Sequence, residues 1–283
     1  MAGPVDPSGD GSRPAVALAR CPDSQTVREV LPRLLDVCAA GSPLRELHGK
    51  HVLLKPNLVT ARPLACTSPA VMAAACRWLL DQGARVRVAD SPGFGTASAV
   101  ARKTGLTDAL APLGIRVEAL DAPQRLALDG GVSFPVSRLA LESDLIVSAA
   151  RVKAHSQMRL TLSVKNLFGC VCGLRKAVIH TRQGQEPDIF ADCLAALAAA
   201  LPPTAGLLDG IVAMHETGPS NGSPYPLGLL GASSSCVALD EAFCALLGCT
   251  VEDVPLAGGV VRRGHAARLC PRWRPPHSPL LPP

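Results

Sequence analysis

The chain has few aromatic residues and no long apolar run. Aromatic residues make up only 3% of its 283 residues although 48% are hydrophobic, so alanine, leucine and valine must form most of the core. No apolar stretch reaches the roughly 18–20 residues that a membrane-spanning helix needs. The best candidate, residues 193–214, is interrupted by Pro202, Pro203 and Asp209. The sequence therefore predicts no membrane span, in a chain long enough to bury a sizeable core.

The cysteines lack a recognisable disulfide or metal-binding pattern. There are eleven, an odd number, and no two have the C-x-x-C spacing. Several, such as Cys38 and Cys193, lie on apolar helical patterns, where a free thiol packs as a small hydrophobic group. The N-terminus has neither the basic start nor the apolar run of a secretory signal peptide. Together these features predict a cytoplasmic protein with mostly structural, reduced thiols.

The positive charge is confined to the C-terminal end. Residues 262–283 contain five arginines and no acidic residue, which accounts for the whole net charge of +5. The rest of the chain is electrically balanced and so does not predict a nucleic-acid-binding face. Residues 1–13 are rich in Pro, Gly and Ser, and residues 262–283 in Pro and Arg, so both ends are predicted to be disordered. Residues 14–261 are predicted to form one domain.

Short apolar strands alternate with helical patterns along this domain. The alternation predicts an α/β fold with a mainly parallel sheet and helices on both faces. The predicted strands are residues 16–19, 51–55, 84–89, 116–120, 144–149 and 205–214. The predicted helices are residues 24–39, 68–82, 97–104, 107–113, 187–201 and 240–247.

Polar side chains follow four of the predicted strands. They are Lys55 and Asn57 after the second strand, Asp90 and Ser91 after the third, Arg151, Lys153 and His155 after the fifth, and His215 and Glu216 after the sixth. The carboxyl ends of parallel strands share one edge, where ligands bind. The residues predicted to line one pocket there are Lys55, Asn57, Asp90, His155, Lys165, Lys176, His180 and Glu216. A turn or helix cap would explain Asp90 or Ser91 alone. The whole set instead predicts substrate-binding residues, namely Lys55, Asn57, Asp90, Ser91 and Glu216.

Lysine is scarce, and half of it lies in one segment. The chain has six lysines against 22 arginines, and three of the six, Lys153, Lys165 and Lys176, lie within residues 153–180. Where arginine is the default cation, a lysine indicates a compact ammonium whose pKa can move. Converging cations bind an anion, or lower the pKa of one lysine so that it acts as a base or forms an imine. A solvated surface cluster is the alternative. The predicted catalytic residues are Lys165, Lys176, His155 and His180, with Asn166 in substrate binding.

Two other segments carry weaker signals. Cys170 and Cys172 would ligate a metal together with His155 or His180, but their spacing is not that of structural zinc, so no metal ligand is predicted. Residues 215–224, H-E-T-G-P-S-N-G-S-P, do not form the H-E-x-x-H zinc motif. They are interpreted as a lid or substrate loop, with a simple Gly/Pro turn as the alternative.

Five blocks together resemble the domain of unknown function 362 family. In order they are K-P-N-L (55–58), A-D-S-P-G (89–93), T-L-S-V-K-N-L-F-G-C-V-C-G-L-R-K with a following histidine (161–180), L-L-D-G-I-V-A-M-H-E-T-G-P (207–219) and A-S-S-S-C-V-A-L-D (232–240). The resemblance covers about residues 50–250. The K-N-L-F-G and D-G-I-x-x-M-x-x-x-G-P blocks are its most specific parts.

The resemblance implies redox chemistry or cluster binding for some members, because many carry a ferredoxin-like iron–sulfur segment. This chain has no C-x-x-C-x-x-C run, so a cluster would be absent or supplied by an iron–sulfur protein partner. The resulting hypothesis is an enzyme that acts on a small anionic substrate, with redox chemistry through an external iron–sulfur or metal partner. The alternatives are a non-catalytic metal or ligand carrier that uses His155, His180 and Cys170, and an inactive relic of the family.

Overall fold

The computed structural model describes residues 14–40, 42–128, 132–172, 187–250 and 253–262. The strands in these residues are β1 (Val16–Arg20), β2 (His51–Lys55), β3 (Arg85–Asp90), β4 (Val117–Ala119), β5 (Pro123–Ala127), β6 (Ser133–Ser137), β7 (Leu145–His155), β8 (Arg159–Thr161), β9 (Thr204–His215), β10 (Ser223–Tyr225) and β11 (Leu229–Ser233). Nine of them form one sheet along the path β1, β11, β9, β7, β2, β3, β4, with β8 on β7 and β10 on β9. β5 and β6 form a separate hairpin.

The centre of the large sheet is parallel. β7 lies between β2 and β9, and β3 lies between β2 and β4, all in parallel pairs. The flanking strands β1, β8, β10 and β11 pair antiparallel. The predicted α/β fold with a mainly parallel sheet is therefore confirmed, and the carboxyl ends of β2, β3, β7 and β9 lie on one edge.

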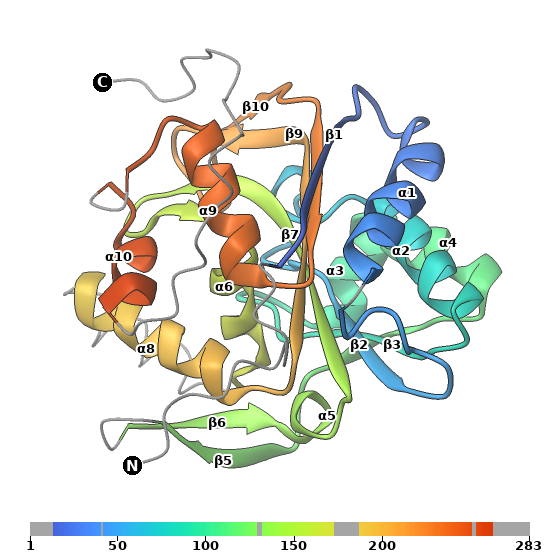
Figure 1. Ribbon diagram of the computed structural model, residues 1–283, viewed down its shortest axis with the longest axis horizontal. Coiled ribbons are helices and arrows are strands. Elements are labelled where there is room, and N and C mark those ends of the chain that lie inside the picture. Colours follow the sequence, from blue (N-terminus) through green and yellow to red (C-terminus); the bar gives the residue numbers. More distant parts are fainter. Residues whose placement is uncertain (1–13, 41, 129–131, 173–186, 251–252, 263–283) are drawn as a thin grey trace.

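Helices cover both faces of the sheet (Figure 1). The α-helices are α1 (Val27–Ala39), α2 (Pro69–Asp81), α3 (Ala97–Lys103), α4 (Leu106–Leu110), α5 (Arg138–Leu141), α6 (Ser163–Asn166), α8 (Pro187–Ala200), α9 (Cys236–Leu246) and α10 (Pro255–Arg262), and the 3-10 helices include η1 (Pro63–Ala65) and η3 (Leu167–Cys170). Helices α1 to α4 lie on one side of the sheet, and α6, α8, α9 and α10 on the other. None of the described helices is long and apolar enough to span a bilayer.

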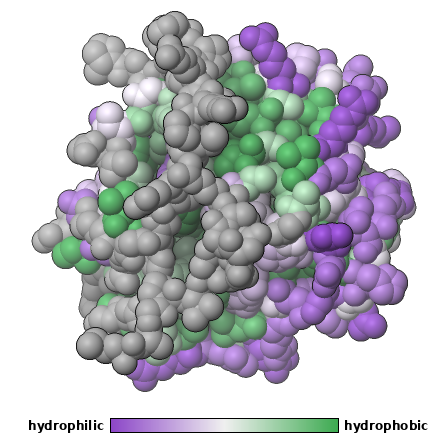
Figure 2. Space-filling view, in the orientation of Figure 1, coloured by the Kyte–Doolittle hydropathy of each residue, from purple (hydrophilic) through white to green (hydrophobic). Residues whose placement is uncertain are grey.

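The two faces have separate cores because side chains alternate along each strand. In β2, Val52 and Leu54 pack into the cluster beneath α1 and α2. Leu53 points to the opposite face and packs into the cluster beneath α8 and α9. Hydrophilic residues gather on the side of the molecule where α1, α2 and α4 lie, at the right of Figure 2.

Two strands are longer than the sequence predicts. β7 was predicted to end at residue 149 and β9 at residue 214, but they continue to His155 and His215. The extensions are paired in hairpins, β7 with β8 and β9 with β10, which satisfies backbone groups that a loop would leave to water. Arg151, Lys153 and His155 therefore lie within β7, whereas the prediction placed them after it.

Other elements were not predicted. They are β5, β6, β8, β10, β11, α5, α6 and α10. Most are only three to five residues long, so they contain too few residues for a periodic pattern to be recognised. α10 ends at Arg262, the first residue of the predicted disordered tail. Residues 1–13 and 263–283 lie outside the described part of the chain, so the predictions for them stand as predictions.

Candidate functional site

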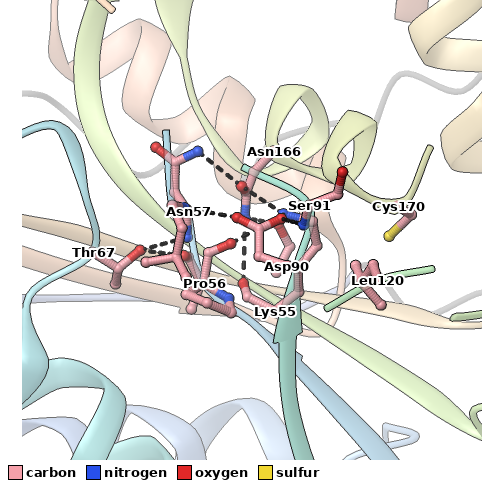
Figure 3. Close-up of polar contacts among 12 residues, drawn as sticks. Lys55, Pro56, Asn57, Thr67, Asp90, Ser91, Leu120, Asn166 and Cys170 are labelled. Carbon is pink, nitrogen blue, oxygen red and sulfur yellow. Dashed lines mark hydrogen bonds and ion pairs between the residues drawn. The ribbon is translucent and has the colours of Figure 1, made fainter. Parts of the chain in front are cut away.

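The Lys55 ammonium is the centre of a buried polar cluster at the carboxyl ends of β2 and β3 (Figure 3). Lys55 is only 1% exposed, and its Nζ lies 2.8 Å from Asp90 Oδ1. Nζ also donates to Pro56 O and to Asn166 Oδ1, each at 3.0 Å. An ammonium has three N–H donors, so three acceptors match them. Lys55 therefore joins the ends of β2 and β3 to α6.

The other members of this cluster are also hydrogen-bonded. Asp90 accepts the backbone N–H of Leu58 at 2.7 Å and that of Ser91 at 2.8 Å. Asn57 Nδ2 donates to Asn166 Oδ1 at 3.1 Å. The structure thus brings together Lys55, Asn57, Asp90, Ser91 and Asn166, which were all predicted as substrate-binding residues. Among the described residues, the buried Asn57 Oδ1 has no hydrogen-bond partner, so it remains an available acceptor at this edge.

Gly169 lies directly against the Lys55–Asp90 ion pair of this cluster. It lies in η3, within the K-N-L-F-G block, and is buried. A Cβ placed on Gly169 would overlap Lys55 Nζ and lie 2.5 Å from Asp90 Oδ1. Only glycine allows the backbone of η3 to approach the ion pair so closely. The glycine of this block is therefore explained by a contact with β2 and β3.

Lys153 lies in β7 and has a different environment from Lys55. It is 1% exposed, and its Nζ donates to one described acceptor, Ala65 O, at 2.7 Å. No described carboxylate lies within ion-pair distance of it. The pKa of Lys153 is lowered to about 7, mainly by burial; the charges of Lys165 and Arg151 also lower it, while Cys66 and Asp90 act in the opposite direction. Lys153 therefore exchanges between ammonium and neutral amine near neutral pH.

Arg151, two residues earlier in β7, is a fixed cation. Its Nε donates to Cys66 O at 2.8 Å, and its Nη1 donates to Val212 O at 2.7 Å. Its Nη2 lies 3.4 Å from Asp209 Oδ2, a carboxylate that is fully buried in β9. Asp209 also accepts the backbone N–H of Ser68 at the start of α2. Arg151 thus holds the loop after β2 against β9, and its charge is balanced there.

His155, predicted as catalytic, is buried at the end of β7. Its Nδ1 accepts the backbone N–H groups of Gln157 and Met158, at 3.2 and 3.3 Å. In the neutral imidazole the proton is therefore assigned to Nε2. The turn between β7 and β8 therefore fixes the orientation of the imidazole ring. Nδ1 is occupied as a hydrogen-bond acceptor.

Glu216, predicted as a substrate-binding residue, lies in the exposed loop between β9 and β10. Its backbone has a φ of 65°, and its carboxylate accepts a hydrogen bond from the hydroxyl of Ser223 at 2.5 Å. The same loop packs against β7, because a Cβ on Gly218 would overlap Ala154 O. The loop therefore lies beside the strand that carries Lys153 and His155.

α6 carries two site residues, Lys165 and Asn166, and is held by a carboxylate from α9. Asp240 Oδ1 accepts the N–H of Ser163 at 2.7 Å, and Oδ2 accepts that of Val164 at 2.9 Å. Burial raises the pKa of Asp240 to about 7. The A-L-D end of the last family block therefore serves to position α6.

Two of the predicted catalytic residues, Lys176 and His180, lie outside the described residues. The described cysteines do not fit an iron–sulfur cluster: Cys170 is buried in the core, and the Cys172 thiol donates to Leu120 O at 3.3 Å. Across the described ranges, no three His, Cys, Asp or Glu side chains are placed to hold a metal ion. The metal carrier of the sequence hypotheses would use His180, which lies outside the described residues, and a partner-supplied cluster would be held by the partner, so both stay hypotheses.

The pH dependence of stability should report the state of Lys153. Its pKa falls from 10.5 in the unfolded chain to about 7 in the folded one, so between these values the unfolded state binds more protons. Stability from this group should therefore rise with pH through that window, by up to about 1.4 kcal/mol per pH unit. Denaturant unfolding of wild type and Lys153→Met at several pH values should show a difference that follows this slope. A pH-independent difference would contradict it.

The chain belongs to the DUF362 family, described as a domain of unknown function, whose sequence model matches residues 52–245. A curated relative, the thylakoid-associated protein sll1697 of Synechocystis sp., is 36% identical over 220 residues. That alignment covers 76% of this chain and 68% of the relative. The family predicted from the sequence blocks is thus confirmed.

Solved structures show more distant likeness. The lactate racemase apoprotein of Thermoanaerobacterium thermosaccharolyticum is 14% identical with a TM-score of 0.49, over 81% of this chain and 56% of that one. A Thermotoga maritima protein is 12% identical with a TM-score of 0.42, over 81% of this chain and 60% of that one. This chain therefore spans little more than half the length of either structure.

The sequence did not single out Arg151 and Lys153 as site residues. Both were noted near a strand end, but neither was given a catalytic or binding role. The available signal was a scarce lysine next to an arginine in an otherwise apolar run, I-V-S-A-A-R-V-K. Charged residues at buried strand positions need partners or a function, and that criterion would have selected both.

Proposed function

We propose that the protein is an enzyme that acts on a small anionic substrate at the carboxyl edge of β2, β3 and β7. The observation that carries this proposal is the buried Lys153, which is 1% exposed and has one described acceptor, Ala65 O, at the edge where Asn57 Oδ1 lacks a described hydrogen-bond partner. Burial is the main cause of its lowered pKa, and the charge of Lys165 adds to it. Such perturbed groups cluster at functional sites.

The roles of the two lysines differ in this proposal. Lys55 and Arg151 face the carboxylates of Asp90 and Asp209 and hold the strand ends and loops of the site together. Lys165, partly exposed on α6, binds the anionic group of the substrate. Lys153, with a pKa of about 7, accepts a proton as a general base.

Other predicted residues assist in this scheme. Asn57 Oδ1 accepts a hydrogen bond from the substrate, and His155 moves a proton through Nε2. Lys176 and His180 lie outside the described residues, and their catalytic role stays a prediction. If the reaction is redox, electrons come from an external iron–sulfur or metal partner, because the described residues hold no cluster ligands. A metal carrier or an inactive relic would need neither a tuned lysine nor anion binding.

Anion binding by matched lysine variants tests the proposal. The probes are phosphate, lactate and pyruvate, measured by calorimetry and by the shift in Tm. At least one should bind wild type, and Lys165→Ala should weaken it about tenfold through loss of a charged contact. Lys50→Ala is the control, since Lys50 is 52% exposed and pairs with the surface carboxylate of Asp144 at 3.7 Å. Equal binding by wild type and Lys165→Ala, or no binding of any probe, would count against the proposal.

A further inference from the structure

A groove on the solvent side of α2 has a volume of about 950 Å³ and lies outside the candidate site. Small-molecule sites in proteins have volumes of about 300–1,000 Å³. α2 packs against both α1 and α4 (Figure 1), so it forms the floor of the groove, and the other two helices form its walls. None of the candidate-site residues lines it. The groove is therefore a second concave surface, which the proposed function does not use.

The floor and walls of the groove are largely apolar. One face of α2 is buried in the core, and a helix of this kind ordinarily carries polar side chains on its other face. On α2 that other face instead carries Ala70, Ala73 and Ala74, which are partly exposed. Pro32 of α1 and Leu113, which follows α4, belong to the walls. An apolar body that fills the groove would remove these side chains from water, which favours binding.

The charged side chains of the groove carry an excess of positive charge. They are Arg28 on α1, Arg77 on α2 and Asp108 on α4, that is, two cations and one carboxylate. Both arginines are exposed, and within the described part of the chain neither forms an ion pair. A guanidinium matches the geometry of a carboxylate and can bind it through two parallel hydrogen bonds. The groove therefore complements a ligand that has an apolar body and an acidic head group.

We propose that this groove binds a long-chain carboxylate, a free fatty acid in monomeric form, with its alkyl chain on the alanines of α2 and its carboxylate at Arg28 and Arg77. A small polar anion would leave the apolar floor unused, and a cationic amphiphile would meet the two arginines. A flat bilayer surface would contact the exposed arginines but not the floor, because the floor lies between α1 and α4. The monomeric carboxylate is the ligand that uses both parts of the groove.

A series of ligands tests the apolar and the charged parts of the groove separately. Wild-type protein is titrated by calorimetry with dodecanoate, octanoate and dodecyltrimethylammonium, each below its critical micelle concentration. Each methylene group that leaves water strengthens binding about fourfold, so the longer dodecanoate should bind more tightly than octanoate, by about tenfold or more. Dodecyltrimethylammonium has an alkyl chain of similar length but the opposite charge, and should bind about tenfold more weakly than dodecanoate or worse. Equal affinities for the three ligands, or no binding of dodecanoate, would overturn the proposal.

Matched variants test whether the ligand lies in this groove. The double variant Arg28→Gln, Arg77→Gln should weaken dodecanoate binding about tenfold or more, because both charged contacts are lost. Ala74→Trp places a large side chain on the floor and should weaken binding by a similar factor. Arg33→Gln changes an exposed arginine of α1 that does not line the groove, so it should leave the affinity unchanged. Circular dichroism checks the fold of each variant, and the glutamine variants, which change only exposed side chains, decide the matter if Ala74→Trp does not fold.

Two further results would assign the ligand elsewhere. Loss of dodecanoate binding in Lys165→Ala, with the Arg28 and Arg77 variants unaffected, would place the carboxylate at the candidate site and overturn the proposal for the groove. Sedimentation of the protein with phosphatidylglycerol vesicles, without binding of monomeric dodecanoate, would assign the two arginines to a membrane surface and also overturn it. Dodecanoate binding that depends on Arg28 and Arg77 but not on Lys165 would support it.

Discussion

Replacing Lys55 by methionine is expected to lower the free energy of unfolding by about 3–5 kcal/mol. The Lys55 ammonium is 1% exposed and 2.8 Å from Asp90 Oδ1. Removing it leaves a carboxylate in the interior without its cation, and also removes the donors to Pro56 O and Asn166 Oδ1. The measurement is denaturant unfolding monitored by circular dichroism.

Two controls determine whether the uncompensated charge is the cause. Lys55→Met combined with Asp90→Asn should recover part of the loss, because the buried negative charge is then gone. Lys50→Met breaks the ion pair with Asp144, in which the two side chains are 52% and 43% exposed. Exposed pairs contribute little, so this change should stay within about 1 kcal/mol. Equal losses for Lys55→Met and Lys50→Met would refute a structural role for the buried pair.

Replacing Gly169 by alanine is expected to cost about 3 kcal/mol, because the new methyl group would overlap the same ion pair. Its Cβ would meet Lys55 Nζ and lie 2.5 Å from Asp90 Oδ1, so η3 or the pair must shift. Gly93→Ala is the matched control at the same edge. Its Cβ would lie 3.4 Å from Val59 O, an ordinary contact, so a change below about 1 kcal/mol is expected.

A double-mutant cycle tests the origin of the Gly169 effect. In a Lys55→Ala background the lysine side chain is absent, so Gly169→Ala should cost less than in wild type. Thermal unfolding of the four proteins gives the interaction energy. Full additivity would show that the cost of the methyl group arises elsewhere in η3.

The strands and helices near the site were predicted closely because their patterns are local. β2 has the predicted bounds, His51–Lys55, and α2 begins and ends within a residue of the predicted range. Strand β2, H-V-L-L-K, ends before Pro56, because proline has no backbone N–H to donate to a neighbouring strand. Ser-Pro before α2 and Gly83 after it are local boundary signals.

The extension of β7 was missed because its pattern there conflicts with burial. R-V-K-A-H alternates charged and apolar residues, which is typical of an exposed strand or a loop. In the fold, Arg151 is buried against Asp209, and Lys153 against Ala65 O. Both contacts come from segments far away in sequence, and the hairpin with β8 pairs the extended backbone. Tertiary contacts thus overrode the local interpretation.

The sequence by itself determined the family, the α/β fold and the edge at which polar residues meet. The family blocks are explicit in the residue order, and the parallel topology places Lys55, Asn57 and Asp90 at one edge whatever the details of packing. Only the tertiary structure decided the state of each lysine. Lys55 has three acceptors, one of which is the carboxylate of Asp90, while Lys153 has one acceptor among the described residues and a pKa lowered by burial. A lysine pKa depends on burial and nearby charges, which are brought together only by folding.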